Sequence, residues 1–165
     1  MVKLIGSVLI FAGGLLARQC RRAECRRRLE ALSDLLSSLR RMGEEIRMAR
    51  TPMPALLRAL AAGRGTEAGA FFAAVSEAAA RGEDLPRAWR ERAEALPLNE
   101  GDKSAVSALG QDLQGDEEKV CKAISHVAYT LAKSAEQAER ERPEREKRAA
   151  ALWFSASALL TILLI

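Results

Sequence analysis

Two apolar segments, one at each end of the chain, most constrain how this sequence can fold. Ala149 to Ile165 is a run of seventeen residues without a charge, and Val2 to Ala17 is apolar except for Lys3. A helix that is apolar on every face suits a lipid bilayer better than the surface of a small soluble domain. We therefore predict one transmembrane helix at residues 1–17 and a second at residues 149–165.

Two processing signals compete with this interpretation of the N-terminal segment, and the residues favour neither. Signal-peptide cleavage after Ala17 would place Leu15 where a small side chain is required. Lipid attachment at Cys20 would need small residues just before it, where Arg18 and Gln19 stand. As helices, the two apolar segments rise about 24 and 26 Å, against a hydrocarbon core of about 30 Å. Local thinning of the bilayer or snorkelling arginines can close that gap.

Basic residues flank both predicted spans on the side of the central segment. They are Arg18, Arg21, Arg22, Arg26, Arg27 and Arg28 after the first span, and Arg140, Arg142, Arg145, Lys147 and Arg148 before the second. Such an excess is typical of cytoplasmic flanks, so residues 18–148 are expected to form a cytoplasmic domain. The basic residues are also expected to contact anionic lipid head groups, at about 1 kcal/mol each. Nucleic-acid binding is disfavoured, because no aromatic residues are interleaved with the arginines.

Residue types that carry chemistry are few. The three cysteines, Cys20, Cys25 and Cys121, are odd in number and lack metal-binding spacing, which favours a reducing compartment. A Ser–His or Cys–His pair would depend on His126, the only histidine. No phosphate-binding loop is present, and the acidic pairs are typical of solvated helix faces. The sequence therefore predicts no enzyme activity, no metal site and no cofactor.

The central segment predicts an all-α domain, since strand-favouring residues are scarce and no stretch alternates apolar and polar residues. A heptad spacing marks the first long helix at Leu29, Leu32, Leu36, Leu39, Gly43 and Ile46, with Leu35, Met42 and Ala49 beside it. Packing inside one bundle and an intermolecular coiled coil both explain this stripe. The bundle is favoured because the repeat is shorter than three heptads.

Caps and breaks predict four short helices and a last long one. Thr51 and Pro52 should start the first short helix, with Thr51 as its cap. Thr66, Leu85-Pro86, and Asn99 or Asp102 should open the next three, while Gly82 and Pro97 close two of them. The last helix should start after Gly115-Asp116 and run into the second span, with a kink or break at Pro143. We therefore expect about six helices, the first and last continuous with the membrane segments.

Each of these helices has an apolar stripe at helical spacing. The predicted core residues are Leu56, Leu57, Leu60 and Ala61; Phe71, Ala74, Val75 and Ala78; Trp89, Ala93 and Leu96; Val106, Leu109 and Leu113; and Val120, Ile124, Val127, Leu131 and Ala135.

Several stretches carry a resemblance to a known family. They are KLIGSVLIF at 3–11, LEALSDLLSSLRRMGEEI at 29–46, TPMPALL at 51–57, Ala88-Trp89, the set Leu109, Gly110, Leu113 and Asp116, and the terminal span. Together with the layout, they resemble the stage III sporulation protein AB family of endospore-forming bacteria. The soluble part of that family is similar to a cytoplasmic domain of the inner-membrane platform proteins of type II secretion and type IV pili.

The resemblance implies a non-enzymatic platform in the channel complex between mother cell and forespore. It places the chain in the outer forespore membrane, on the mother-cell side. A cytoplasmic secretion-type ATPase and ring-forming channel membrane proteins are its implied partners, and a homo-oligomer is compatible with such a role. The alternative is a general membrane-anchored adaptor, or a secretion or pilus platform protein, that acts in vegetative cells.

An exposed, charged turn is the best candidate for a docking surface, since loops carry contacts more often than buried stripes do. The candidate residues are Arg47, Arg50, Thr51, Pro52, Pro54 and Arg58. A purely capping role of Thr51 and Pro52 explains the same turn.

Overall fold

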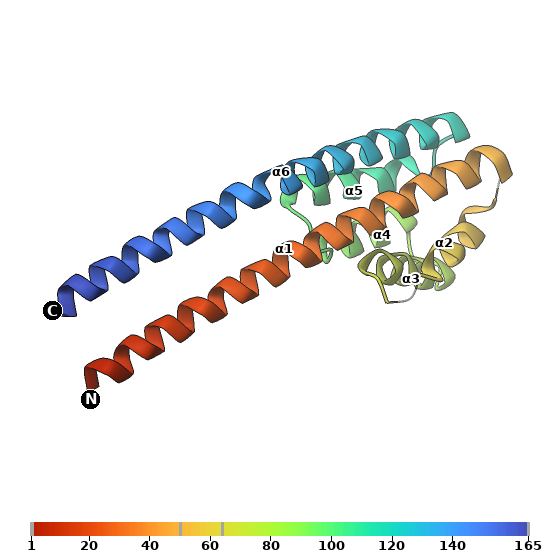
Figure 1. Ribbon diagram of the computed structural model, residues 1–165. Coiled ribbons are helices and arrows are strands. Elements are labelled where there is room, and N and C mark those ends of the chain that lie inside the picture. The colour runs from red at the N-terminus through yellow and green to blue at the C-terminus, as the bar shows by residue number, and fades with distance from the viewer. Residues whose placement is uncertain (1, 50, 64, 165) are drawn as a thin grey trace.

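The computed structural model describes the backbone of residues 2–49, 51–63 and 65–164, and the side chains of residues 19–49, 51–63 and 65–140. Within these ranges the chain forms six α-helices and no β-strand. They are α1 (Val2–Ala49), α2 (Met53–Ala61), α3 (Glu67–Ala80), α4 (Leu85–Glu94), α5 (Glu100–Asp112) and α6 (Glu117–Leu164), as Figure 1 shows. The predicted all-α bundle of six helices is confirmed.

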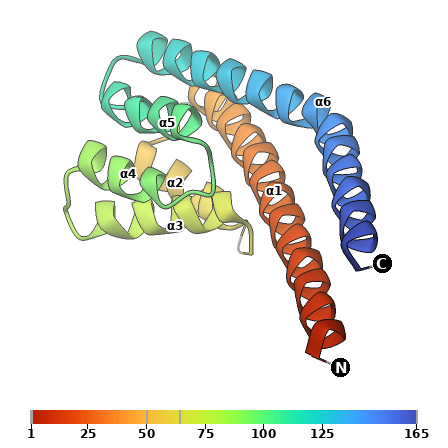
Figure 2. The ribbon, with the colours of Figure 1, turned by 90° about the vertical axis from the view of Figure 1, so that its left-hand side faces the viewer.

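The two long helices pack against each other; α2, α3 and α5 lie against them, and α4 packs on α3 and α5 (Figure 2). Helix α1 packs on α6, α3 and α2, while α5 packs on α6 and α4, and α3 packs on α4 and α2. These contacts close a ring of helices around one core. A Cβ added to Gly43 of α1 would lie 3.5 Å from Ile124 of α6, so the two long helices approach closely at that point.

Both predicted membrane spans, residues 1–17 and 149–165, lie outside the residues whose side chains the structure describes. The backbone at Pro143 is described, and α6 continues through this residue as one α-helix from Glu117 to Leu164, so the break predicted there as the alternative to a kink does not occur. Across the part of the chain that is described, no helix combines the length and the apolar character needed to cross a bilayer.

The buried face of α1 is centred differently from the predicted stripe. Its core residues are Leu32, Leu35, Leu39, Met42 and Ile46. Leu29, Leu36 and Gly43 are only half-buried, and Ala49 is exposed. The reason is that α1 packs on α6 along one side and on α2 and α3 along the other, so the centre of its buried face lies between these neighbours. The stripe is thus covered within the chain, as the bundle interpretation predicts.

The stripes of the other helices are largely as predicted. Buried members are Leu56, Leu57, Leu60, Phe71, Val75, Ala78, Trp89, Ala93, Leu96, Val106, Leu109, Leu113, Val120, Ile124, Val127 and Leu131. Ala61, Ala74 and Ala135 are only half-buried. Phe72 was not predicted, yet it is fully buried, and its ring stands edge-on to Trp89 with centroids 5.9 Å apart. Phe71 stands edge-on to the same tryptophan at 4.9 Å.

Two of the predicted helix starts are confirmed through their caps. Thr66 accepts a hydrogen bond from the Gly69 amide at 3.0 Å and caps α3. Asn99, rather than Asp102, caps α5 by accepting a 2.6 Å bond from the Asp102 amide. Helix α3 ends as predicted near Gly82, whose φ of 78° places it in the left-handed region that glycine adopts without strain.

The prediction that Thr51 caps α2 is wrong. The cap position is held by Pro52, in an extended conformation with no side-chain hydrogen bond, and Pro54 lies in the first turn. The Thr51 hydroxyl instead donates to Glu45 at 3.2 Å. The amides in the first turn of a helix have no acceptor within the helix, so Pro54, which lacks an amide hydrogen, is tolerated there. Because the cap is Pro52, the helix starts later than the sequence predicts.

Candidate docking surface at the end of the bundle

The predicted docking residues lie at the end of the bundle where α1 passes into α2. The turn from α5 to α6 lies at the same end (Figure 1). Because α1 is one continuous helix, Arg47 stands about 39 Å along it from Arg21. The candidate docking surface and the arginines predicted to flank the membrane are therefore at opposite ends of the described domain.

On the α2 side of this end, Pro52, Pro54 and Arg58 are exposed, and Thr51 is half-buried. The Arg58 Nε donates to the Pro54 carbonyl at 3.2 Å, so its guanidinium is held against the first turn of α2. The structure thus brings Pro54 and Arg58 together. Arg50 lies outside the described residues.

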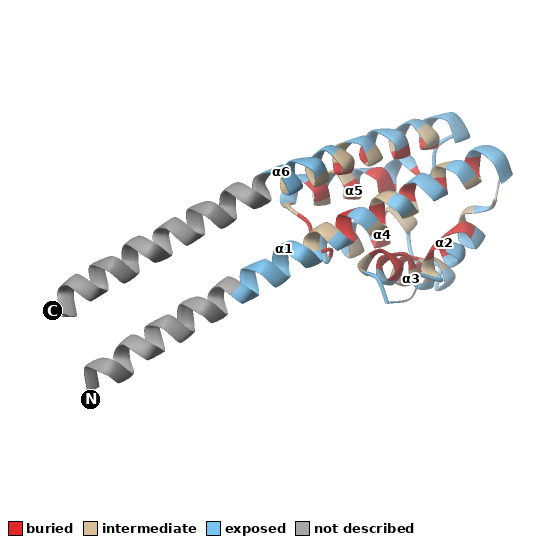
Figure 3. Ribbon diagram, in the orientation of Figure 1, coloured by how far each residue is buried: buried red, intermediate tan, exposed pale blue. Residues whose placement is uncertain are grey.

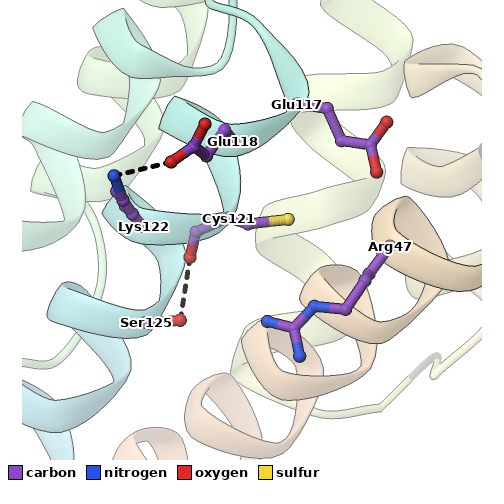
Figure 4. Close-up of a pocket in the computed structure, with 6 residues that line it drawn as sticks. All are labelled: Arg47, Glu117, Glu118, Cys121, Lys122 and Ser125. Atoms are coloured by element: carbon purple, nitrogen blue, oxygen red, sulfur yellow. Dashed lines mark hydrogen bonds and ion pairs between the residues drawn. The ribbon is translucent and has the colours of Figure 1, made fainter.

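Arg47 faces a groove between the two long helices (Figure 4). The groove is open to solvent, has a volume of about 590 Å³, and is lined by Arg47 of α1 and by Glu117, Glu118, Cys121, Lys122 and Ser125 of α6. Glu118 and Lys122 form an ion pair at 2.8 Å, and the Cys121 thiol points into the groove. This surface carries both signs of charge.

The α6 half of that groove was missed from the sequence. The sequence indicated only an ordinary acidic pair on a solvated helix face at Glu117 and Glu118. Both residues are exposed. The predicted helix start after Asp116 was the available signal, since it placed the pair in the first turn of α6. What the sequence could not supply was the neighbouring end of α1, seventy residues earlier in the chain.

Among the arginines predicted to flank the membrane, Arg26, Arg27 and Arg28 have partners in the domain. Arg26 pairs with Glu30 of its own helix at 2.7 Å, and this hydrogen bond and the opposite charge raise the pKa of Arg26. The guanidinium of Arg27 pairs with Glu67 of α3 at 2.7 Å, and Arg28 lies 3.6 Å from Asp102 of α5. Arg27 and Arg28 therefore help to attach α1 to the bundle.

Of the other basic residues, Arg21 and Arg22 are exposed on α1. The side chains of Arg18, Arg142, Arg145, Lys147 and Arg148 lie outside the described residues, and Arg140 pairs with Glu136 at 2.6 Å. No grouping of three or more His, Cys, Asp or Glu side chains suited to a metal ion occurs among the residues that the structure describes. His126 is exposed, and the three cysteines are unpaired.

A family model for stage III sporulation protein AB matches residues 3–165. The chain belongs to the stage III sporulation protein AB family. The structure is also similar to a solved structure of stage III sporulation protein AB (SpoIIIAB), with a TM-score of 0.65 over 72% of this chain and 98% of that chain. Their sequence identity is 21%, so this second match shows the shared fold. A comparison with curated proteins gave no match.

Membership of the stage III sporulation protein AB family implies a role in stage III of sporulation. In this member, two of the stretches that carried the resemblance meet in the core. A Cβ on Gly110 would lie only 2.8 Å from the Trp89 ring, and Trp89 Nε1 donates to the Val106 carbonyl at 2.8 Å. Ala88-Trp89 and Leu109-Gly110 are therefore packing residues.

Proposed function

We propose that this protein is a non-enzymatic platform of the channel complex between mother cell and forespore. Family membership supports the sporulation role. The observation that supports the platform role is the arrangement of α1 and α6, the first and last helices, which pack against each other and carry the short helices α2, α3 and α5. With the predicted spans continuing these helices, the bundle would stand on two legs in the outer forespore membrane and face the mother-cell cytoplasm.

The proposed partner at the far end of the bundle is a cytoplasmic secretion-type ATPase. Arg47, Arg58 and the Thr51–Pro54 turn are accessible there, about 39 Å along α1 from Arg21, so a cytoplasmic protein reaches them without meeting the bilayer. Charge at an interface favours fast and selective association. Ring-forming channel proteins would contact the membrane-proximal helices.

Reversing two charges on this surface tests the ATPase contact. The double variant R47E/R58E should lose co-purification of the full-length protein with the ATPase of the same operon and should block sporulation after engulfment. R90E is the matched control, because Arg90 is also exposed but lies on α4. If R47E/R58E binds the ATPase as the unaltered protein does, the docking surface lies elsewhere.

A gene deletion and a labelling experiment test the wider proposal. Deletion of the gene should leave vegetative growth normal, whereas a growth defect in cells that never sporulate would favour the adaptor of growing cells. Cys121 lines the groove on the proposed cytoplasmic face. Its labelling by a membrane-impermeant thiol reagent on intact cells would contradict the proposed topology.

A further inference from the structure

One carboxylate links three helices at the end of the bundle opposite the docking surface. Asp102, in the first turn of α5, is 1% exposed and is the buried charged residue of the described core. Its Oδ1 accepts a hydrogen bond from the Ser134 hydroxyl of α6 at 2.6 Å. Its Oδ2 lies 3.6 Å from Arg28 Nη2 of α1.

The two links differ in kind. The bond to Ser134 is short and directional, which holds α5 against α6. The contact with Arg28 is an ion pair without a hydrogen bond, since no described protein atom bonds to Asp102 Oδ2 or to Arg28 Nε. An ion pair at that distance tolerates small displacements better than a hydrogen bond does. The Arg28–Asp102 contact is therefore the looser of the two links.

This cluster lies where α1 and α6 leave the bundle. Residues 19–27 of α1 are all exposed, and Leu131 is the last buried residue of the described part of α6 (Figure 3). The next residues of α1 toward the core, Ala31 and Leu32, are buried and apolar. Close packing of apolar side chains fixes the crossing angles of helices inside the core. Among the described residues of α1, however, none before Ala31 is buried, so the polar contacts of Asp102 take over that role at the rim.

Asp102 is buried and Arg28 is half-buried, and an ion pair that desolvates a carboxylate is seldom the best choice for stability alone, because apolar residues of similar volume often stabilise as much or more. Its well-attested use is to select one arrangement of helices over others. We infer that Arg28, Asp102 and Ser134 form a latch that sets the direction in which α1 leaves the bundle. When the Arg28–Asp102 contact opens, the segment of α1 before Ala31 changes direction relative to α5 and α6. This inference does not depend on the proposed ATPase contact.

A distance measurement on the full-length protein tests the latch. Spin labels would be placed on Cys20, exposed on α1, and on A108C, an exposed position of α5, after Cys25 and Cys121 are replaced by serine. Cys20 lies about 12 Å beyond Arg28 along α1, so a pivot at the latch displaces it. In D102N, which keeps the side-chain shape but removes the charge, the distance distribution should at least double in width or show a second maximum.

D112N is the matched control, since Asp112 belongs to the same helix but is exposed. Its distance distribution should equal that of the unaltered protein. A folded D102N with an unchanged distribution would overturn the latch, as would equal broadening in D112N. If D102N does not fold, R28Q decides the question, because it removes the α1 partner of Asp102 and leaves the Ser134–Asp102 hydrogen bond in place. R28Q should broaden the distribution, and an unchanged R28Q refutes the inference.

Discussion

Replacing Gly110 with alanine should destabilise the domain, because the site has no room for a methyl group. A Cβ there would lie 2.8 Å from Cδ1 and Cγ of Trp89 and 2.9 Å from its Cβ. Trp89 is fully buried, and its Nε1 bond to Val106 and its edge-on contacts with Phe71 and Phe72 hold the ring in place. The ring cannot move away from position 110 without disturbing these interactions.

The balance of effects gives the expected magnitude. Overpacking a tight core costs about 1–3 kcal/mol, and weakening the Trp89 hydrogen bond adds about 1 kcal/mol. Alanine is favoured over glycine in a helix by about 1 kcal/mol, which offsets part of this cost. The net loss of unfolding free energy in G110A should be about 2 kcal/mol. For a domain of this size, that lowers Tm by roughly 5–10 °C.

Thermal unfolding of the full-length protein, followed by far-ultraviolet circular dichroism, measures this loss. G101A is the matched control in the same helix. A Cβ at Gly101 would approach only Asn99 Oδ1, at 3.6 Å, an ordinary contact. G101A should therefore be stabilised, by up to about 1 kcal/mol. If G110A melts at or above the temperature of the unaltered protein while G101A behaves as expected, the close approach of Gly110 to Trp89 is refuted.

Two further predictions use pairs of neighbouring or similar residues. T66A should lose about 1 kcal/mol of unfolding free energy in urea, because Thr66 caps α3. T51A should lose clearly less, because Thr51 is not a cap, and equal losses would contradict this assignment. L35A should lower the free energy of unfolding by about 2–5 kcal/mol, since Leu35 is 1% exposed. L36A should lower it less, since Leu36 is half-buried. The reverse order would favour the stripe predicted from the heptad spacing.

Much of the fold could be predicted because its signals act over a few residues. The caps at Thr66 and Asn99 and the glycine at 82 are local hydrogen-bonding or backbone preferences, and the structure confirms them. Apolar spacing in the short helices likewise needs no knowledge of the neighbouring helix. Phe72 was missed because it lies beside the predicted stripe of α3 and is buried by Trp89, which belongs to another helix.

The candidate site was less predictable. The sequence identified an exposed turn with arginines, and Arg47, Pro52, Pro54 and Arg58 are indeed exposed. It did not identify the α6 wall of the groove, because helices α2 to α5 separate the two walls in the chain. The resemblance to the sporulation family was visible in scattered positions, and the family match confirms it.

The sequence by itself determined the helical class, the number of helices, most of their ends and the apolar face of each short helix. All of these follow from local propensity, capping and periodicity. The tertiary structure alone decided which side of α1 is buried, why position 110 is a glycine, and that Arg28 meets Asp102. Each of these depends on an approach between helices distant in the chain, and local preferences carry no information about such distances.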